Sequence, residues 1–223
     1  MPLYLGKQKI NIKNVQVNCC RLLIRKNDSN IVHLPKECLF AKDFILNYIN
    51  YHNQFYPKNK NCFIYLTIRT TEKDCYYKNS CTWHVDGFQG AKIDRHIPEQ
   101  GIIWSNVNPT EFLMQPFYLA GLDSAKHDIH DYLNKNGNEG MAYKGVENGV
   151  YLITPYNVHR ACEKNINKKR VLIRINFSPV EIQDYTNTDN PMLPMKYNYR
   201  EDIRDHLWSY DLDETKVNGF VKM

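Results

Sequence analysis

Two histidines and one aspartate have the residue types and spacing of a metal-binding site. His84 and Asp86 lie two residues apart, and alternate residues of a strand point to the same face, so the imidazole and the carboxylate can bind one ion. His159, which follows the apolar run 149–154 and a turn, is the best candidate for a third ligand. Two imidazoles and a carboxylate on one face leave neighbouring coordination positions open. That ligand set suits Fe(II), although it would also admit Zn, Mn or Co.

The run 170–177 places cationic groups on a strand that follows His159. It alternates strictly, with branched or aromatic apolar side chains on one face and Arg170 and Arg174 on the other. An arginine that points into a β-barrel is costly unless an anion meets it, and a guanidinium can bind a carboxylate through two parallel hydrogen bonds. The pattern therefore indicates a ligand that carries a carboxylate.

This order of motifs resembles the 2-oxoglutarate/Fe(II)-dependent dioxygenase superfamily. His84-x-Asp86 is followed by His159 and then, eleven residues later, by Arg170, a spacing most similar to phytanoyl-CoA-hydroxylase-like and taurine-dioxygenase-like members. The resemblance covers about residues 62–180. It implies Fe(II) as cofactor, 2-oxoglutarate as cosubstrate and ascorbate as a candidate reductant. The implied reaction couples decarboxylation of 2-oxoglutarate to oxidation of a C–H bond, most simply a hydroxylation.

The resemblance also implies roles for five further residues. Arg170 would bind the distal carboxylate of 2-oxoglutarate, while the 2-oxo acid end chelates the iron. Arg174 matches a position that faces the primary substrate in some members. Trp104 lies near the place where phytanoyl-type members have an active-site tryptophan. Tyr65 and Arg69, on the strand before the His-x-Asp turn, are expected to line the pocket.

Each of these features also has a purely structural interpretation. Asp86 before Gly87 is an ordinary turn pair, and Arg170 suits a solvent-facing position on an edge strand. His127 and His130 form a rival pair, because residues three apart share one face of a helix. The segment around them is charged at nearly every second position, which favours a solvated helix face over a second metal site.

The elements that must position these residues are mainly strands. Residues 8–25 alternate loosely and predict one or two strands, and Pro35 opens a predicted helix over 36–52. Further helices are expected over 124–135 and 201–210. The β-rich runs are 62–69, 101–107, 111–117, 141–146, 149–154 and 170–177.

Several short strands separated by turn residues favour an antiparallel sandwich or barrel. With the family resemblance, we predict one mainly β domain over 1–223 with flanking helices and a double-stranded β-helix (jelly-roll, cupin-like) core. The core is expected over 62–180. Residues 1–61 would buttress it with strands and a helix, and 181–223 would form a C-terminal loop and helix.

Composition bounds the partners and the compartment. The chain of 223 residues has a net charge of +5 without a long basic block, so nucleic acid is not favoured over a small molecule or a peptide or protein side chain as substrate. Seven cysteines without a CxxC pair, no signal peptide and no apolar run of about 20 residues predict a soluble protein of the cytoplasm with no membrane partner. No feature of the sequence predicts an oligomeric state.

Two alternative functions stay open. A cupin-like metalloenzyme could use the same three ligands without 2-oxoglutarate, and it would bind metal but release no succinate. A non-catalytic module on the same barrel could bind an anion through Arg170 and Arg174, and it would tolerate replacement of His84. Residues 86–104 carry no clear family signature, and such loops usually decide which substrate is bound.

Overall fold

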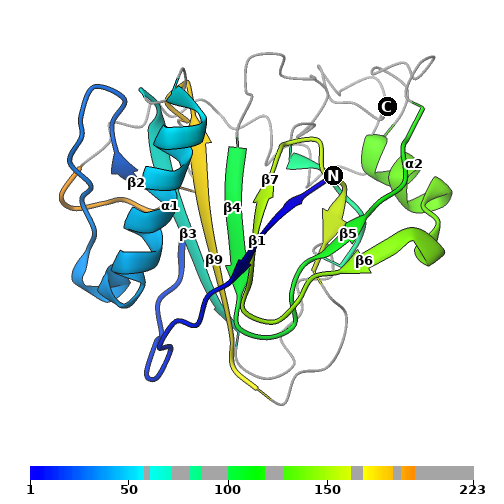
Figure 1. Cartoon of the computed structure of the whole chain (residues 1–223), viewed down its shortest axis with the longest axis horizontal. Coiled ribbons are helices and arrows are strands. Elements are labelled where there is room, and N and C mark those ends of the chain that lie inside the picture. The colour runs from blue at the N-terminus through cyan, green and yellow to red at the C-terminus, as the bar shows by residue number, and fades with distance from the viewer. Residues whose placement is uncertain are drawn as a thin grey trace, which may run out of the picture.

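The structure is a computed structural model that describes residues 1–57, 61–71, 81–86, 100–118, 128–161, 168–182 and 187–193. These residues form two antiparallel β-sheets and few helices (Figure 1). The prediction of a mainly β chain with flanking helices is confirmed. No helix in the described part of the chain is long and apolar enough to cross a membrane.

The larger sheet has six strands in the order β1-β7-β4-β9-β3-β2, and every neighbouring pair is antiparallel. In that order their bounds are Leu3–Lys7, Gly149–Ile153, Gln100–Ser105, Arg170–Ser178, Phe63–Thr71 and Cys19–Arg25. The smaller sheet has the order β6-β5-β8, with bounds Ala142–Lys144, Glu111–Leu113 and His159–Arg160. Neighbouring strands are mostly far apart in the sequence, so the site is assembled by long-range pairing.

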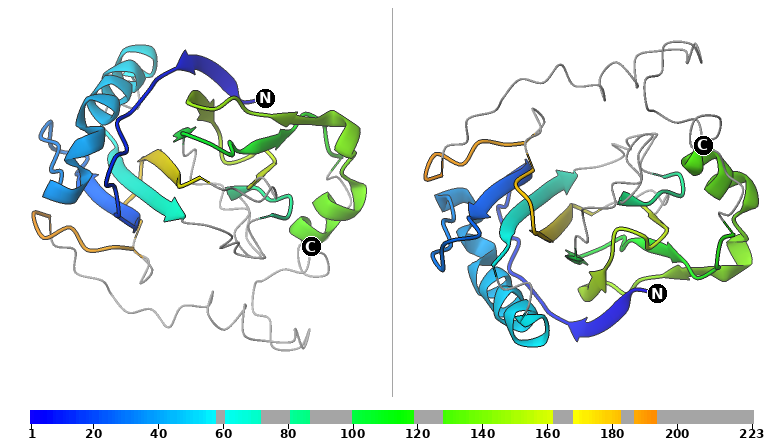
Figure 2. Two further views of the ribbon diagram at one scale, coloured as in Figure 1. Left: turned by 90° about the horizontal axis from the view of Figure 1, so that it is seen from below. Right: turned by 90° about the horizontal axis from the view of Figure 1, so that it is seen from above.

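The outer face of the larger sheet packs against a helix. A 3-10 turn, Lys36–Ala41, leads into α1, Lys42–Phe55, whose buried apolar residues share one cluster with the apolar face of β9. Figure 2 shows α1 on one side of the molecule and α2, Ile129–Asn136, on the opposite side, with the strands between them. The outer face of the larger sheet thus lies in the hydrophobic core.

The inner face of the larger sheet meets the smaller sheet. Phe112 of β5 lies in one buried cluster with Ile103, Tyr151 and Ile153 of the larger sheet, and the Phe112 and Tyr151 ring centroids are 5.3 Å apart. Because side chains alternate along a strand, Arg174 belongs to this inner face, where its neighbours across the sheet are Thr67 and Ile103.

Helix α2 covers the other face of the smaller sheet. Ile129 and Leu133 pack there against Val85, Leu113 and other buried residues. The helix begins after Asp128, whose side chain accepts hydrogen bonds from the backbone N–H groups of the first turn. A short 3-10 turn, Glu139–Met141, follows and leads into β6.

Most predicted elements are present with shifted bounds. The predicted strand region 8–25 contains only β2, since β1 comes earlier, and the runs 111–117 and 141–146 shorten to β5 and β6. The predicted helix over 36–52 is the 3-10 turn plus α1, and that over 124–135 is α2, with 124–127 outside the described residues. The helix predicted over 201–210 also lies outside them. The subdivision at residues 61 and 180 stays a prediction.

Candidate metal centre

His84 and His159 face each other across an antiparallel β-bridge. The His84 N–H donates to the His159 carbonyl at 3.0 Å, and the His159 N–H donates to the His84 carbonyl at 2.9 Å. Residues that are directly opposite in an antiparallel pair project to the same side, so the two imidazoles lie together, with ring centroids 4.5 Å apart. One backbone contact therefore sets the geometry of two of the predicted ligands.

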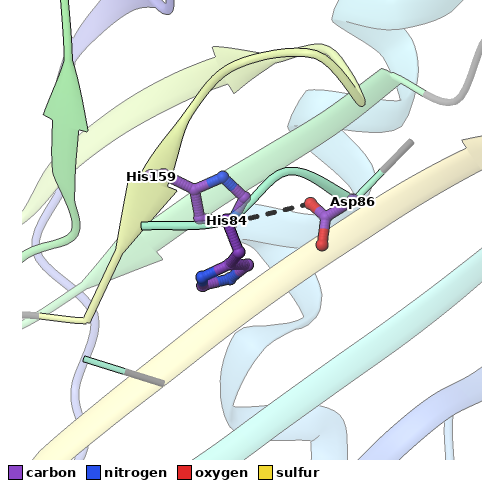
Figure 3. Close-up of side chains that lie close together, drawn as sticks. All are labelled: His84, Asp86 and His159. Carbon is purple, nitrogen blue, oxygen red and sulfur yellow. Dashed lines mark ion pairs between the residues drawn. The ribbon is translucent and has the colours of Figure 1, made fainter. Parts of the chain in front are cut away.

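Asp86 completes the predicted group. It lies two residues after His84, and the ligand atoms of the three side chains all lie within 4.8 Å of one another (Figure 3). The His159 Nε2 is 3.6 Å from the Asp86 Oδ2. His159 is buried, and the other two are partly buried. Within the described residues, this is the one group of three or more His, Cys, Asp or Glu side chains that could hold a metal ion.

Backbone carbonyls select the tautomer of both imidazoles. The Nδ1 of His84 lies 2.8 Å from the Thr82 carbonyl, and the Nδ1 of His159 lies 2.8 Å from the Asn157 carbonyl. A carbonyl can only accept, so in the neutral form of each ring Nδ1 carries the hydrogen and Nε2 is the nitrogen that can bind a metal. That is the arrangement by which ligating histidines are normally oriented towards a metal.

The charges at the site also match a metal centre. Burial would raise the pKa of Asp86, but the Arg174 guanidinium, together with the two imidazoles, holds it far below its usual range. Burial lowers the pKa of His159 to about 4, although Asp86 opposes this. An ionised carboxylate and a neutral imidazole are the forms that bind a cation, so the residues present fit a divalent metal such as Fe(II).

The structure brings Arg174 into contact with this group. Its Nη2 is 2.6 Å from the Asp86 Oδ2, and both side chains are largely sheltered from solvent. Arg170 begins β9 opposite Thr71, about 13 Å further along the strand by the usual rise per residue. Its Nε donates to the Asn108 carbonyl at 3.0 Å. Its assignment to the distal carboxylate of 2-oxoglutarate stays a prediction.

Tyr65 and Arg69 lie on the same inner face of the larger sheet as Arg174. Tyr65 is fully buried opposite Asn176, and its hydroxyl accepts a hydrogen bond from the Ile182 N–H at 2.7 Å. Arg69 is exposed, opposite Leu172. Both residues therefore belong to the inner face, and their contact with a ligand stays a prediction.

The structure does not bring Trp104 to the site. Trp104 is opposite Ile173 on the outer face of the sheet, where its indole packs in the main core near Phe44, with ring centroids 6.1 Å apart. Its Nε1 donates to the Gln8 carbonyl at 2.8 Å. The preceding residue, Ile103, takes the inner position instead. Alternation along β4 turns the indole away from the site.

Two side chains of α2, those of Asn134 and His130, lie beside the His84 segment; no local pattern indicated Asn134, and His130 was expected on a solvated helix face. The Asn134 amide accepts from the Trp83 N–H at 2.8 Å and donates to the Trp83 carbonyl at 2.9 Å. The ring of His130 lies 6.1 Å from that of His84, between centroids, and burial and His84 lower its pKa. The expectation of a solvated helix face is therefore wrong for His130. His127 lies outside the described residues.

A cavity of about 600 Å³ lies behind the site rather than in front of it. Its walls are mostly apolar and include Val85, Leu113, Ile129 and Val158. Val85 lies between His84 and Asp86 and points to the opposite side of its segment, under α2. The cavity is therefore separated from the metal-facing side by the backbone that carries the ligands.

Comparison with known proteins gave limited similarity. No family model matches the chain, and no curated protein matches it. Among solved structures, EvdO2 from Micromonospora carbonacea var. aurantiaca is similar with a TM-score of 0.41 at 15% identity, over 76% of this chain and 76% of that one. The same protein complexed with 2-oxoglutarate gives a TM-score of 0.39 at 13% identity, over 74% of this chain and 72% of that one.

Proposed function

We propose that this chain is an Fe(II)/2-oxoglutarate-dependent dioxygenase. One observation carries the proposal: two imidazoles, each oriented by a backbone carbonyl at Nδ1, and one ionised carboxylate converge beside an inward-facing arginine. This donor set suits a divalent metal and leaves coordination positions for a chelating cosubstrate and dioxygen. The proposal extends to a hydroxylase that acts on a small molecule or on a peptide or protein side chain.

We further propose that the two sheets form a double-stranded β-helix. From β4 onwards the chain passes back and forth between the sheets: β4 lies in the larger sheet, β5 and β6 in the smaller one, β7 in the larger, β8 in the smaller and β9 in the larger. The shared cluster around Phe112 supports two facing layers. His84 and His159 lie on the smaller sheet and Arg174 on the larger one, and the contact between Arg174 and Asp86 joins the two layers.

The proposed chemistry divides the work between the bound groups and the chain. Bound iron, with 2-oxoglutarate and dioxygen, supplies the oxidising power, and ascorbate could keep the metal ferrous. His84, Asp86 and His159 hold the metal. Arg170 is proposed to bind the distal carboxylate of the cosubstrate, while Arg174 keeps Asp86 ionised and adds positive charge where anionic groups would enter. The buried cluster around Phe112 and Ile103 is proposed to limit the access of water.

The deciding experiment measures succinate formation from 2-oxoglutarate. Anaerobically purified protein is reconstituted with Fe(II) and ascorbate and then exposed to oxygen, beside His84→Ala and a surface control, Lys135→Met. Lys135 forms an exposed helix pair with Asp131 and lies outside the site. Succinate from the wild type and from Lys135→Met, but not from His84→Ala, would support the proposal.

A metalloenzyme without 2-oxoglutarate is the second candidate, and one observation favours it. The inward-facing Arg174 already has an anionic partner within the protein, Asp86, so its position does not require a cosubstrate carboxylate. This candidate predicts Mn(II) binding without 2-oxoglutarate binding. Equilibrium binding of 2-oxoglutarate to the Mn(II)-loaded protein separates the two. If neither is bound, the non-catalytic anion-binding alternative is favoured.

A further inference from the structure

A compact cluster lies directly behind the two histidines. Since His84 is opposite His159, the register of this bridge places Trp83 opposite Arg160, and side-chain alternation turns both to the other side of the sheet. The Arg160 Cζ lies 3.9 Å from the centroid of the Trp83 ring. Trp83, which precedes His84, is thus stacked on Arg160, which follows His159.

Two carboxylates hold the Arg160 guanidinium in place. Its Nε donates to the Glu111 Oε2 at 2.9 Å, and its Nη1 and Nη2 donate to the two oxygens of Glu139 at 2.8 and 2.7 Å. Glu139 also accepts from the Trp83 Nε1 at 2.9 Å. The Arg160 and Glu111 side chains are only 16% and 15% exposed, so water screens this pair less than it would screen an open surface pair. All three guanidinium nitrogens are used, which leaves the group a single orientation.

The backbone alone gives the two histidines little support. β8 has two residues, and the segment with His84 joins it through an isolated bridge rather than a ladder. On the other edge, Asn134 holds Trp83, the residue that Arg160 stacks on. The Arg160 cluster therefore ties together β5, β8, the turn at Glu139 and the His84 segment at the place where backbone pairing is shortest.

We infer that Arg160, through Trp83 and Glu139, is a positioning residue that fixes the separation and orientation of His84 and His159 in the candidate metal centre. The inference rests on the metal centre of the proposed function and not on the use of 2-oxoglutarate. Outer residues that orient metal ligands typically change metal affinity by about 10- to 100-fold when they are replaced.

The direction in which metal affinity changes on replacing Arg160 distinguishes a positioning role from a purely electrostatic one. Arg160 is a cation near a site for a cation, and Arg160→Met would leave two carboxylates uncompensated. By charge alone, this replacement should strengthen the binding of a divalent metal. We expect the opposite, a loss of about 10-fold or more in affinity, because the ligand geometry is no longer held. Arg160→Lys keeps the positive charge but not the planar guanidinium that bonds Glu111 and Glu139 together, so it should also bind the metal more weakly.

The test uses the full chain, stripped of metal and titrated anaerobically with Mn(II), with free Mn(II) followed by electron paramagnetic resonance. Arg160→Met and Glu139→Gln are compared with the wild type and with Lys135→Met, which removes an exposed cation on α2. Circular dichroism checks the fold of each variant. Visible absorption of the Co(II)-saturated proteins then reports ligand geometry independently of affinity.

Weaker Mn(II) binding and an altered Co(II) spectrum in folded Arg160→Met, with Lys135→Met like the wild type, would support the inference. Wild-type affinity and spectrum in folded Arg160→Met would overturn it. If Arg160→Met does not fold, Glu139→Gln decides, because Glu139 is 62% exposed and its replacement should be tolerated; unchanged binding there overturns the inference. A wild type that binds neither metal would refute the metal centre itself, and with it the proposed function.

Discussion

Arg174 and Asp86 meet at a single pair of atoms, Nη2 and Oδ2, with side chains that are 18% and 15% exposed. If Arg174 is replaced by an apolar residue, water compensates the Asp86 charge poorly, because the pair is sheltered from solvent. We expect Arg174→Met to lower the free energy of unfolding of the metal-free protein by about 2 kcal/mol. Urea unfolding followed by circular dichroism measures this loss.

The same variant should respond strongly to metal. Saturating Mn(II) should stabilise Arg174→Met more than the wild type, because a bound dication supplies the positive charge that Asp86 has lost. Arg170→Met is the matched control, since the Nε of Arg170 bonds a backbone carbonyl. An equal gain from Mn(II) in both variants would mean that Arg174 does not act on Asp86.

At the scale of single elements, the alternation of side chains along β4 places Trp104 in the core rather than at the site. Its indole is buried against α1 and its Nε1 is hydrogen-bonded to Gln8. Trp104→Phe should therefore cost about 1–3 kcal/mol in unfolding free energy through a cavity and a lost hydrogen bond. The KM for 2-oxoglutarate in the succinate assay should stay unchanged. A raised KM with unchanged stability would instead place Trp104 at the site.

Helix α2 acts on the site through its Asn134 amide, which satisfies both backbone groups of Trp83 as a neighbouring strand would. Asn134→Ala leaves these groups without partners, and we expect it to lower the free energy of unfolding by about 1–3 kcal/mol. Asn136→Ala is the control, because among the described residues its amide bonds only the Tyr132 carbonyl, in its own exposed helix turn. Thermal unfolding of the two variants compares them, and equal losses would contradict a special role for Asn134.

These elements show where sequence reasoning succeeds and where it stops. The grouping of His84 with Asp86 follows from local alternation, and the order of the motifs indicated His159 as the third ligand. The partner of Arg174 depended on how β9 lies relative to the His84 segment, and no local pattern encodes that. His130 was misjudged because the charged residues around it suggested solvent on every side, whereas one face of α2 packs on the smaller sheet.

At the scale of the whole molecule, several histidines favour the folded state only when they are neutral. Burial lowers the pKa of His52 and His159 to about 4 each, and it also lowers the pKa of His130. Unfolded histidines titrate near pH 6.5. As the pH falls from 6.5 towards 4, the unfolded chain takes up protons that the folded chain does not, so the free energy of unfolding falls with pH.

His52 isolates this effect from the metal centre. It is 1% exposed, on α1, with its ring stacked on Phe177 at 3.8 Å between centroids, and the opposing effect of Gln100 on its pKa is smaller than that of burial. Between pH 7 and 4.5 the metal-free wild type should lose more unfolding free energy than metal-free His52→Leu. We expect the difference between the two losses to be about 2 kcal/mol. Urea unfolding of the wild type and His52→Leu across this range measures the difference. Parallel curves would show that His52 is protonated equally in both states, so that the pH dependence must come from other titrating groups.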